Sequence, residues 1–154
     1  MYMESLKMPL GMVVIKMLKP MFRVLEFRAS KQTNIKLTMA QFGLLFAISE
    51  EKEEVILKDM AEKMGKDKSA ILRMIDLLEK KELVRRVVNL NDRRKNYILV
   101  TKKGERLIAE FRQVELELNC ELLEGISDAD IQTFHKIVDH IKVKSDQLCL
   151  ISKI

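Results

Sequence analysis

The sequence has few of the residues that interrupt or cross-link a chain. Its 154 residues include two prolines, five glycines, two cysteines and two histidines. So little proline and glycine leaves hardly any room for flexible linkers, and no segment is of low complexity or repeats another. The length therefore suits one domain, or one compact unit with an extension for dimerisation.

The cysteines and histidines form no recognisable reactive or metal-binding motif. Cys120 and Cys149 stand far apart and match neither a CxxC motif nor a metal spacing. We expect each to be a buried structural cysteine, because a reactive thiol needs an accessible, electropositive setting. His135 and His140 are five positions apart on an expected helix, so they share no face. The sequence predicts no metal site and no cofactor.

Membrane-spanning and catalytic patterns are also missing. The apolar stretch from Met8 to Met21 contains Lys16, Lys19 and Pro20 and has no small-residue cleavage site. It is too short and too charged to span a bilayer, so we expect a cytoplasmic protein without a membrane partner. The chain has no paired acid and base, nucleophile elbow or phosphate-binding loop. We therefore do not expect an enzyme.

Positive charge is concentrated in one part of the chain. The segment from Leu57 to Arg106 holds 15 Lys and Arg against 8 Asp and Glu, a net charge of +7, whereas the remainder holds 13 against 15, a net charge of −2. Charge gathered in this way favours a nucleic-acid partner over general solubility, and duplex DNA above all. Scattered, solvated lysines on helix surfaces are the alternative.

Both ends of the chain show the three-and-four spacing of amphipathic helices. Residues 1–36 follow it through Pro20, where we expect a kink or a new helix start because proline lacks a backbone donor. Residues 107–154 predict a long helix, an interruption at Gly125 and a last helix capped by Ser127. Neither C-terminal helix has an obvious partner within the chain. We expect both ends to be dimerisation regions that pack on a second copy.

The middle segment, residues 37–106, predicts a helix-turn-helix followed by a hairpin. Thr38 and Gln41 suit a capping box at the start of one helix. A short helix from Leu57 then stops at Gly65, which suits a left-handed cap, and Asp67 suits the cap of the next helix. Two helices joined by a glycine-containing turn are typical of DNA-binding proteins.

The second helix of this pair has two distinct sides. Apolar residues lie on one side, and Ser69, Arg73 and Asp76 lie on the other. The segments 84–89 and 96–101 are rich in strand-forming residues and enclose a polar turn, so they predict a β-hairpin, or wing. Val55 and Ile56 can add a short strand. The predicted fold is mainly α-helical with a small β-hairpin: a winged helix-turn-helix flanked by long dimerisation helices.

Five short motifs make this segment similar to one known family. They are Leu57-Lys58-Asp59-Met60-Ala61, Ser69 to Arg73, Asp76-Leu77-Leu78-Glu79, Asp92-Arg93-Arg94 and Val100-Thr101-Lys102-Lys103-Gly104. On the basis of these motifs, the chain resembles the multiple-antibiotic-resistance regulator (MarR) family of winged-helix transcription factors. The wing signature of that family is Asp-x-Arg, five residues, Leu-Thr, and Gly three positions further on. Here only Val100 departs from its Leu-Thr pair.

The resemblance implies a homodimer that binds a pseudo-palindromic operator. It also implies repression, or less often activation, relieved by a small phenolic ligand or by thiol oxidation. Ser69 and Arg73 are then expected to meet base edges or phosphates in the major groove, and an arginine can pair with guanine. Lys66 and Lys68 suit phosphates, which add affinity without reading sequence.

The wing residues complete the expected DNA-binding set. Arg94 matches the family's wing arginine, which reaches into the minor groove. Asp92 is expected to position that arginine, while Arg93 and Lys95 either contact the DNA backbone or are solvated. The rival hypothesis is a winged helix without operator specificity that binds a protein partner.

Two residues depart from the family pattern. Glu82 stands where the family usually has glycine after the recognition helix, so we expect a non-glycine residue at positive φ, at a cost of about 1 kcal/mol. Leu72 replaces a common threonine in the recognition helix. It is expected to change the sequence preference.

Overall fold

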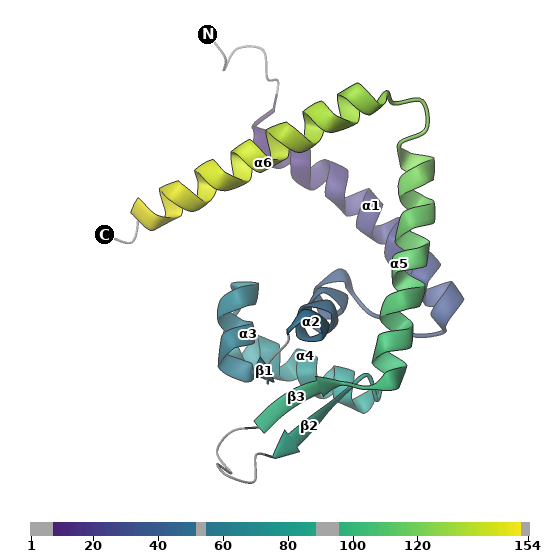
Figure 1. Cartoon of the computed structure of the whole chain (residues 1–154), viewed down its shortest axis with the longest axis vertical. Helices are drawn as coiled ribbons and strands as arrows, with labels where there is room; N and C mark the ends of the chain where they lie inside the picture. The colour runs from purple at the N-terminus through teal and green to yellow at the C-terminus, as the bar shows by residue number, and fades with distance from the viewer. Residues whose placement is uncertain (1–7, 52–54, 89–95, 152–154) are drawn as a thin grey trace. The chain divides into compact units, whose positions relative to one another are not determined.

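The computed structural model describes residues 8–51, 55–88 and 96–151 of the chain (Figure 1). The helices are α1 Leu10–Thr33, α2 Met39–Glu50, α3 Leu57–Met64, α4 Lys68–Lys80, α5 Lys102–Leu122 and α6 Asp128–Ile151. The strands are β1 Val55–Ile56, β2 Val84–Val88 and β3 Asn96–Val100. The predicted mainly α-helical fold with a small hairpin is confirmed.

The strands form one antiparallel sheet in the order β1-β3-β2. In the hairpin, Val84 pairs with Val100 and Val88 pairs with Asn96, while Val55 of β1 pairs with Ile98 of β3. The short strand expected at residues 55 and 56 is therefore present. It ties the segment before the helix-turn-helix to the hairpin that follows it.

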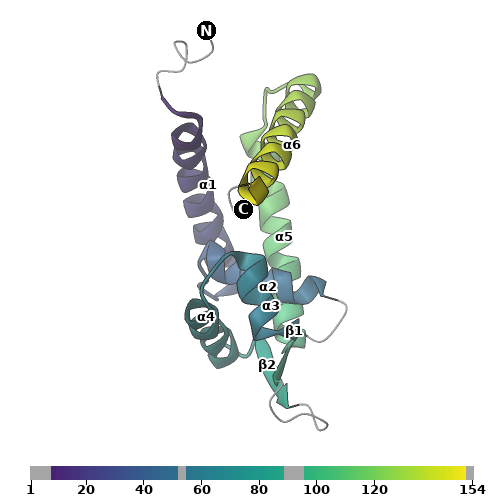
Figure 2. The ribbon, with the colours of Figure 1, turned by 90° about the vertical axis from the view of Figure 1, so that its left-hand side faces the viewer.

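The chain divides into two compact units, Met1–Glu117 and Leu118–Ile154. In the first unit, α2, α3, α4 and the sheet form a lobe from which the hairpin extends (Figures 1 and 2). Its core is apolar, and the largest of its fully buried side chains are Leu44, Leu45, Met60, Ile71, Ile75, Leu78, Leu83 and Val84. The burial of these apolar side chains stabilises the packing of α4 and the hairpin on the lobe.

Helix α2 begins with the predicted capping box. The Thr38 hydroxyl accepts from the backbone N–H of Gln41, and the Gln41 side chain accepts from the backbone N–H of Thr38. From α1, Glu26 accepts from the backbone N–H of Met39 at 2.6 Å, so a carboxylate sits at the positive end of the α2 dipole. This contact and the burial of Leu25 and Ala29 attach the end of α1 to the lobe.

Helix α1 continues through Pro20 as one element. The alternative of a new helix start at that proline is wrong. The first half of α1 leaves large apolar side chains exposed, including Val13, Ile15 and Met17. Packing within the chain therefore does not account for the apolar character of this half.

The expectation that neither C-terminal helix has a partner within the chain is wrong for the first half of α5. This half does have a partner within the chain, because Leu107, Phe111 and Val114 are buried. The rings of Phe111 and Phe42 stack with centroids 3.4 Å apart, and the Arg112 guanidinium lies over the Phe46 ring at 5.0 Å. The first half of α5 thus belongs to the core of the first unit.

The second unit consists of the end of α5 and helix α6. Gly125 adopts φ +79° between them, and Ser127 accepts from the backbone N–H of Asp130, as its predicted role as a cap requires. Apart from Leu118 and the half-buried Ile131, the described side chains of this unit are exposed. Among the described residues, no helix combines the length and the apolar character that crossing a bilayer requires.

Candidate nucleic-acid interface

The turn between α3 and α4 sets the position of the second helix. Gly65 lies at φ +59°, and the backbone N–H groups of Gly65 and Lys66 donate to the carbonyls of Glu62 and Ala61. These two bonds close α3 as a Schellman cap, which requires the left-handed conformation that glycine adopts without strain. The Asp67 carboxylate then accepts from the backbone N–H of Ala70 at 2.8 Å and starts α4.

Helix α4 buries one side and exposes the other. Ile71, Ile75 and Leu78 are 0% exposed and hold the helix on the lobe. Opposite them lies an exposed surface that we call the outward face of α4. It comprises Lys68, Ser69, Leu72, Arg73 and Asp76. The predicted division of this helix into an apolar and a polar side is confirmed.

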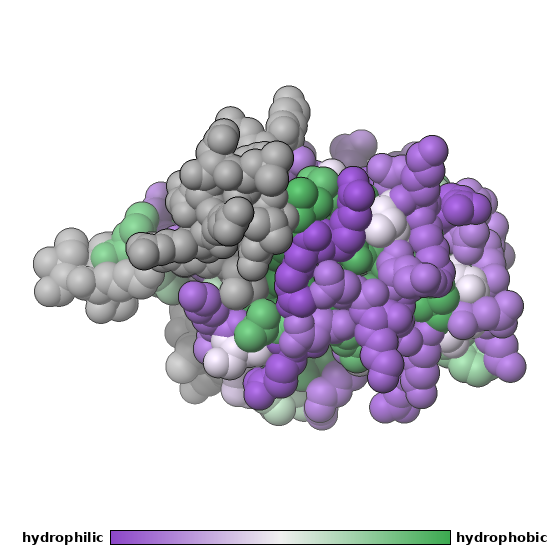
Figure 3. Space-filling model, turned by 90° about the horizontal axis from the view of Figure 1, so that it is seen from below, coloured by the Kyte–Doolittle hydropathy of each residue, from purple (hydrophilic) through white to green (hydrophobic). Residues whose placement is uncertain are grey.

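The structure brings the predicted residues of the helix-turn-helix together. Lys68, Ser69 and Arg73 lie on the outward face of α4, and Lys66 is exposed in the turn just before it. Seen from below, the described side chains are mostly hydrophilic (Figure 3). The predicted wing residues Asp92, Arg93, Arg94 and Lys95 lie outside the described residues.

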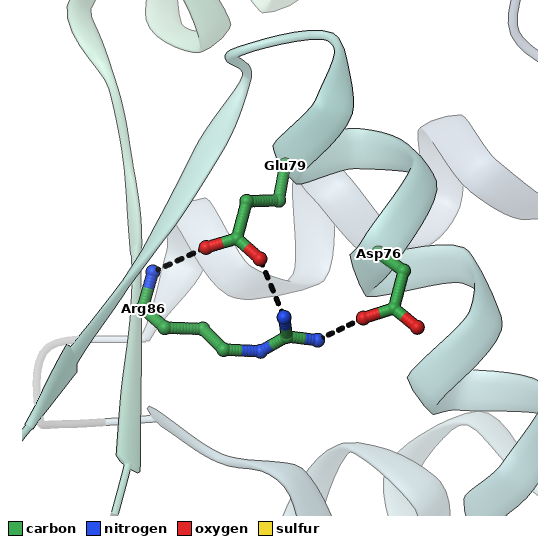
Figure 4. Close-up of polar contacts among 3 residues, drawn as sticks. All are labelled: Asp76, Glu79 and Arg86. Atoms are coloured by element: carbon green, nitrogen blue, oxygen red, sulfur yellow. Dashed lines mark hydrogen bonds and ion pairs between the residues drawn. The ribbon is translucent and has the colours of Figure 1, made fainter.

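Three charged side chains connect α4 to the hairpin (Figure 4). Arg86 on β2 donates from one guanidinium nitrogen to Glu79 at 2.5 Å and from the other to Asp76, and its backbone N–H donates to Glu79 at 3.2 Å. A guanidinium that binds two carboxylates fixes orientation as well as distance. We call this group the Arg86 clamp. It links β2 of the hairpin to α4, the recognition helix.

The C-terminal cap of α4 contains a glutamate, Glu82, at a position where glycine is common. Glu82 adopts φ +62°, as predicted, while the backbone N–H groups of Glu82 and Leu83 donate to the carbonyls of Glu79 and Leu78. This is a second Schellman cap, with glutamate where glycine is common. A hydrogen bond from Lys103, at 2.8 Å, and its positive charge lower the pKa of the Glu82 carboxyl.

The start of α5 fits closely against this cap. The Thr101 hydroxyl donates to the carbonyl of Glu82 at 2.6 Å and accepts from the backbone N–H of Gly104 at 3.1 Å. A Cβ atom on Gly104 would lie 2.3 Å from the carbonyl oxygen of Leu83. The Thr-x-x-Gly part of the wing signature therefore has a structural reason: it joins the recognition helix, the hairpin and α5.

The sequence did not predict the Arg86 clamp. Asp76 and Glu79 stood in the family motif, but nothing assigned them a partner, and Arg86 was one basic residue among many. The available signal was the three-residue spacing of the two acids, which places both on one side of a helix. An arginine on the following strand then completes the group.

The structure also bears on the cysteine and metal expectations. Cys120 and Cys149 are both exposed, so the expectation of buried structural cysteines is wrong. Within the described ranges, no group of three or more His, Cys, Asp or Glu side chains could hold a metal ion. A small cleft of about 10 Å³ lies beside the end of α1, lined by residues that include Glu26, Phe42 and Phe111.

Taken together, a capped helix pair, an exposed basic recognition helix and a three-stranded sheet with a hairpin define a winged helix-turn-helix protein of the DNA-binding type. Residues 37–95 match the model of the MarR family. Residues 37–95 of the chain therefore form a MarR-family domain, of the kind found in winged-helix transcription regulators.

Solved structures share this fold over most of their length. A crystal structure of MarR has a TM-score of 0.77 and 22% identity over 93% of this chain and 95% of that one. Wild-type apo MarR from E. coli has a TM-score of 0.70 and 24% identity over 87% and 97%. CouR from Rhodococcus jostii RHA1, bound to p-coumaroyl-CoA, has a TM-score of 0.66 and 24% identity over 85% and 90%.

Proposed function

We propose that this protein is a homodimeric, sequence-specific DNA-binding repressor whose affinity for its operator is lowered by a small ligand or by thiol oxidation. The observation that carries the proposal is the outward face of α4. That face is exposed and basic, while the opposite side of the same helix is fully buried. A rigid helix with a free polar face is what the major groove of duplex DNA accepts.

The proposed contacts fall into two kinds. Ser69 and Arg73, one turn apart on α4, are proposed to reach base edges or phosphates together, because side chains four residues apart share one face of a helix. Lys66 and Lys68 stand at the start of the helix and suit phosphates, which position the protein without reading sequence. Arg94 of the wing is proposed to enter the minor groove, with Asp92 as its positioning residue and Arg93 and Lys95 near the DNA backbone.

Exposed apolar surface supports a homodimer. In α6, the exposed residues Phe134, Ile137, Val138 and Ile141 follow helical spacing, and the first half of α1 is similar. Contiguous apolar surface of this kind usually marks an interface. In a dimer with a two-fold axis, the exposed apolar surface of one copy would pack on the same surface of the other. The dimer would then present two copies of α4 to one pseudo-palindromic site.

Two observations support control by an effector. CouR, which shares the fold, is bound to p-coumaroyl-CoA in its structure. In this chain the cleft beside the end of α1 has room for about one water molecule, so a larger ligand would have to widen it. The exposed Cys120 and Cys149 are accessible to an oxidant, which supports the thiol route.

The test is the salt dependence of binding to the DNA upstream of the protein's own gene. A protein that contacts phosphates releases counterions, so we expect the logarithm of the binding constant to fall linearly with the logarithm of salt concentration. The variant Lys68→Gln should reduce that slope by about 1, whereas Arg73→Ala should cost roughly 1–3 kcal/mol and relax the preference for one base pair. Lys136→Gln, with the same charge loss on exposed α6, is the control.

One result would overturn the proposal, and another would remove the wing from it. If the full-length protein shows no salt-sensitive binding to that DNA, the regulator function fails and the protein-binding alternative takes its place. If Arg94→Ala gives an unchanged gel shift, the wing has no part in DNA binding. We expect Arg94→Ala to weaken operator binding while sedimentation still shows an intact dimer.

A further inference from the structure

The outward face of α4 carries one large apolar side chain. Leu72 is 42% exposed, although its neighbours Ile71 and Ile75 on the same helix are 0% exposed. Lys68 lies four positions before it and Ser69 three, so both share its face. Leu72 therefore does not belong to the core. It sits amid the side chains proposed to meet DNA.

The basic residues around Leu72 favour an anionic partner, and the leucine side chain itself favours an apolar group on that partner. Lys68 and Arg73 flank it, and both are exposed. Asp76 is the one acidic member of this face, and its carboxylate is turned toward β2, where Arg86 binds it (Figure 4). The Arg86 clamp thus draws the negative charge to one side and leaves Leu72 between basic and hydroxyl groups.

Duplex DNA offers an apolar group in the major groove at one kind of base only. The 5-methyl group of thymine projects into that groove, and apolar side chains contact it. We propose that Leu72 is a specificity-determining residue that reads a thymine methyl group in each half of the operator. This inference rests on the proposed DNA-binding function and assigns one position of the recognised sequence to a van der Waals contact rather than to a hydrogen bond.

The size of the effect follows from the area of one methyl group. Removing a buried methyl from the interface costs about 0.8 kcal/mol, which corresponds to about a fourfold rise in Kd for each half-site. Replacing thymine by uracil removes only this methyl and leaves every hydrogen-bonding group of the base in place. The change is therefore specific for the proposed contact.

The experiment is a thymine-to-uracil scan of the duplex that the wild-type protein protects in its own upstream DNA. For the wild type, we expect one thymine per half-site at which uracil raises Kd about fourfold. For Leu72→Ala, the unmodified duplex should bind several-fold more weakly, and uracil at that thymine should have no further effect. Such a double-mutant cycle isolates the contact between the two groups. Leu99→Ala, which removes another exposed leucine of the same unit, is the control.

The outcomes separate this inference from the function on which it rests. Absence of any salt-sensitive duplex binding overturns both. Normal duplex binding that no uracil substitution changes overturns the role of Leu72 alone. A uracil effect of the same size in wild type and Leu72→Ala assigns the methyl contact to another residue and also overturns the inference. Circular dichroism checks that the variants keep the helical content of the wild type.

Discussion

Helices α4 and α6 both carry apolar side chains at a spacing of three and four residues, but only α4 buries them within the chain. Ile71, Ile75 and Leu78 of α4 are fully buried, whereas Ile137 of α6 is 53% exposed. The same spacing of apolar residues therefore occurs in a helix that is buried on one side and in a helix that is exposed. The apolar side of α4 supplies core for its own unit, and that of α6 remains available to a partner.

Helix α4, the recognition helix, is attached to its own unit at both ends and along its buried side. Helix α4 is capped at both ends, its apolar side is inserted in the core and the Arg86 clamp joins it to the hairpin. Helix α6 is held by its own backbone hydrogen bonds and by the cap at Ser127. A helix of the second kind gains most of its stability from tertiary or quaternary packing. The two helices should therefore respond differently to the same kind of substitution.

The largest effect is expected for Ile75→Ala in α4. Removing a fully buried isoleucine side chain costs its transfer free energy and leaves a cavity, which together lower the free energy of unfolding by about 3–4 kcal/mol. Urea unfolding followed by circular dichroism measures this loss. Leu72→Ala on the exposed side of the same helix should change the free energy of unfolding by less than about 0.5 kcal/mol. An equal loss for both variants would contradict the description of α4 as two-sided.

Ile137→Ala in α6 should act in a smaller and different way. Within one chain the side chain is already exposed, so its loss should weaken the dimer by about 1–2 kcal/mol, or roughly tenfold in dissociation constant. The effect should depend on protein concentration, because dimerisation stabilises the folded state by mass action. Sedimentation equilibrium measures it, with Gln132→Ala on the same helix as control. A loss of stability that is independent of concentration would show that Ile137 packs within its own chain.

Sequence patterns predicted the elements around α4 well because their signals are local. Thr38, Gly65 and Asp67 act within a few residues of the chain, so their capping roles were predicted and are confirmed. The positive φ of Glu82 was predicted in the same way, from a single position.

Contacts between distant segments escaped prediction. Phe42 and Phe111 are remote in sequence, and nothing near either residue indicates that their rings stack. The Arg86 clamp depends on the angle between a helix and a strand, which only the folded core defines. The exposure of Cys120 and Cys149 likewise depends on what covers each helix face. The roles of Arg94 and its neighbours stay predictions.

Glu82→Gly tests the cap that ends α4. Glycine adopts positive φ freely, so relief of the backbone conformation should raise the free energy of unfolding by about 1 kcal/mol, less whatever the contact with Lys103 contributes. Gly125→Ala is the matched reverse change, because Gly125 holds φ +79° between α5 and α6 with nothing within 4 Å of an added Cβ atom. It should lose a similar amount. Thermal melts of the two variants at one protein concentration compare them, and a less stable Glu82→Gly protein would show that the side chain matters more than the backbone.

The smallest effect is expected for Glu82→Gln, which removes the charge and keeps the backbone strain. The hydrogen bond and charge of Lys103 lower the pKa of Glu82 below its ordinary value of 4.5 in the folded chain. Folding is therefore favoured by the ionised carboxylate, and this contribution is fully present above the pKa of the unfolded state. As the pH falls through the lower pKa of the folded state, the contribution is lost.

Wild type should accordingly be slightly more stable than Glu82→Gln at pH 7, and the two should converge in acid below the folded pKa. Urea unfolding at a series of pH values from 7 to 2 measures the difference, which is small because both side chains are largely exposed. In a Lys103→Gln background the pH-dependent part should disappear, since the partner that lowers the pKa is gone. A difference that persists unchanged into acid would show that it does not arise from the charge of Glu82, because protonated glutamate and glutamine are both neutral and share the same aliphatic carbons.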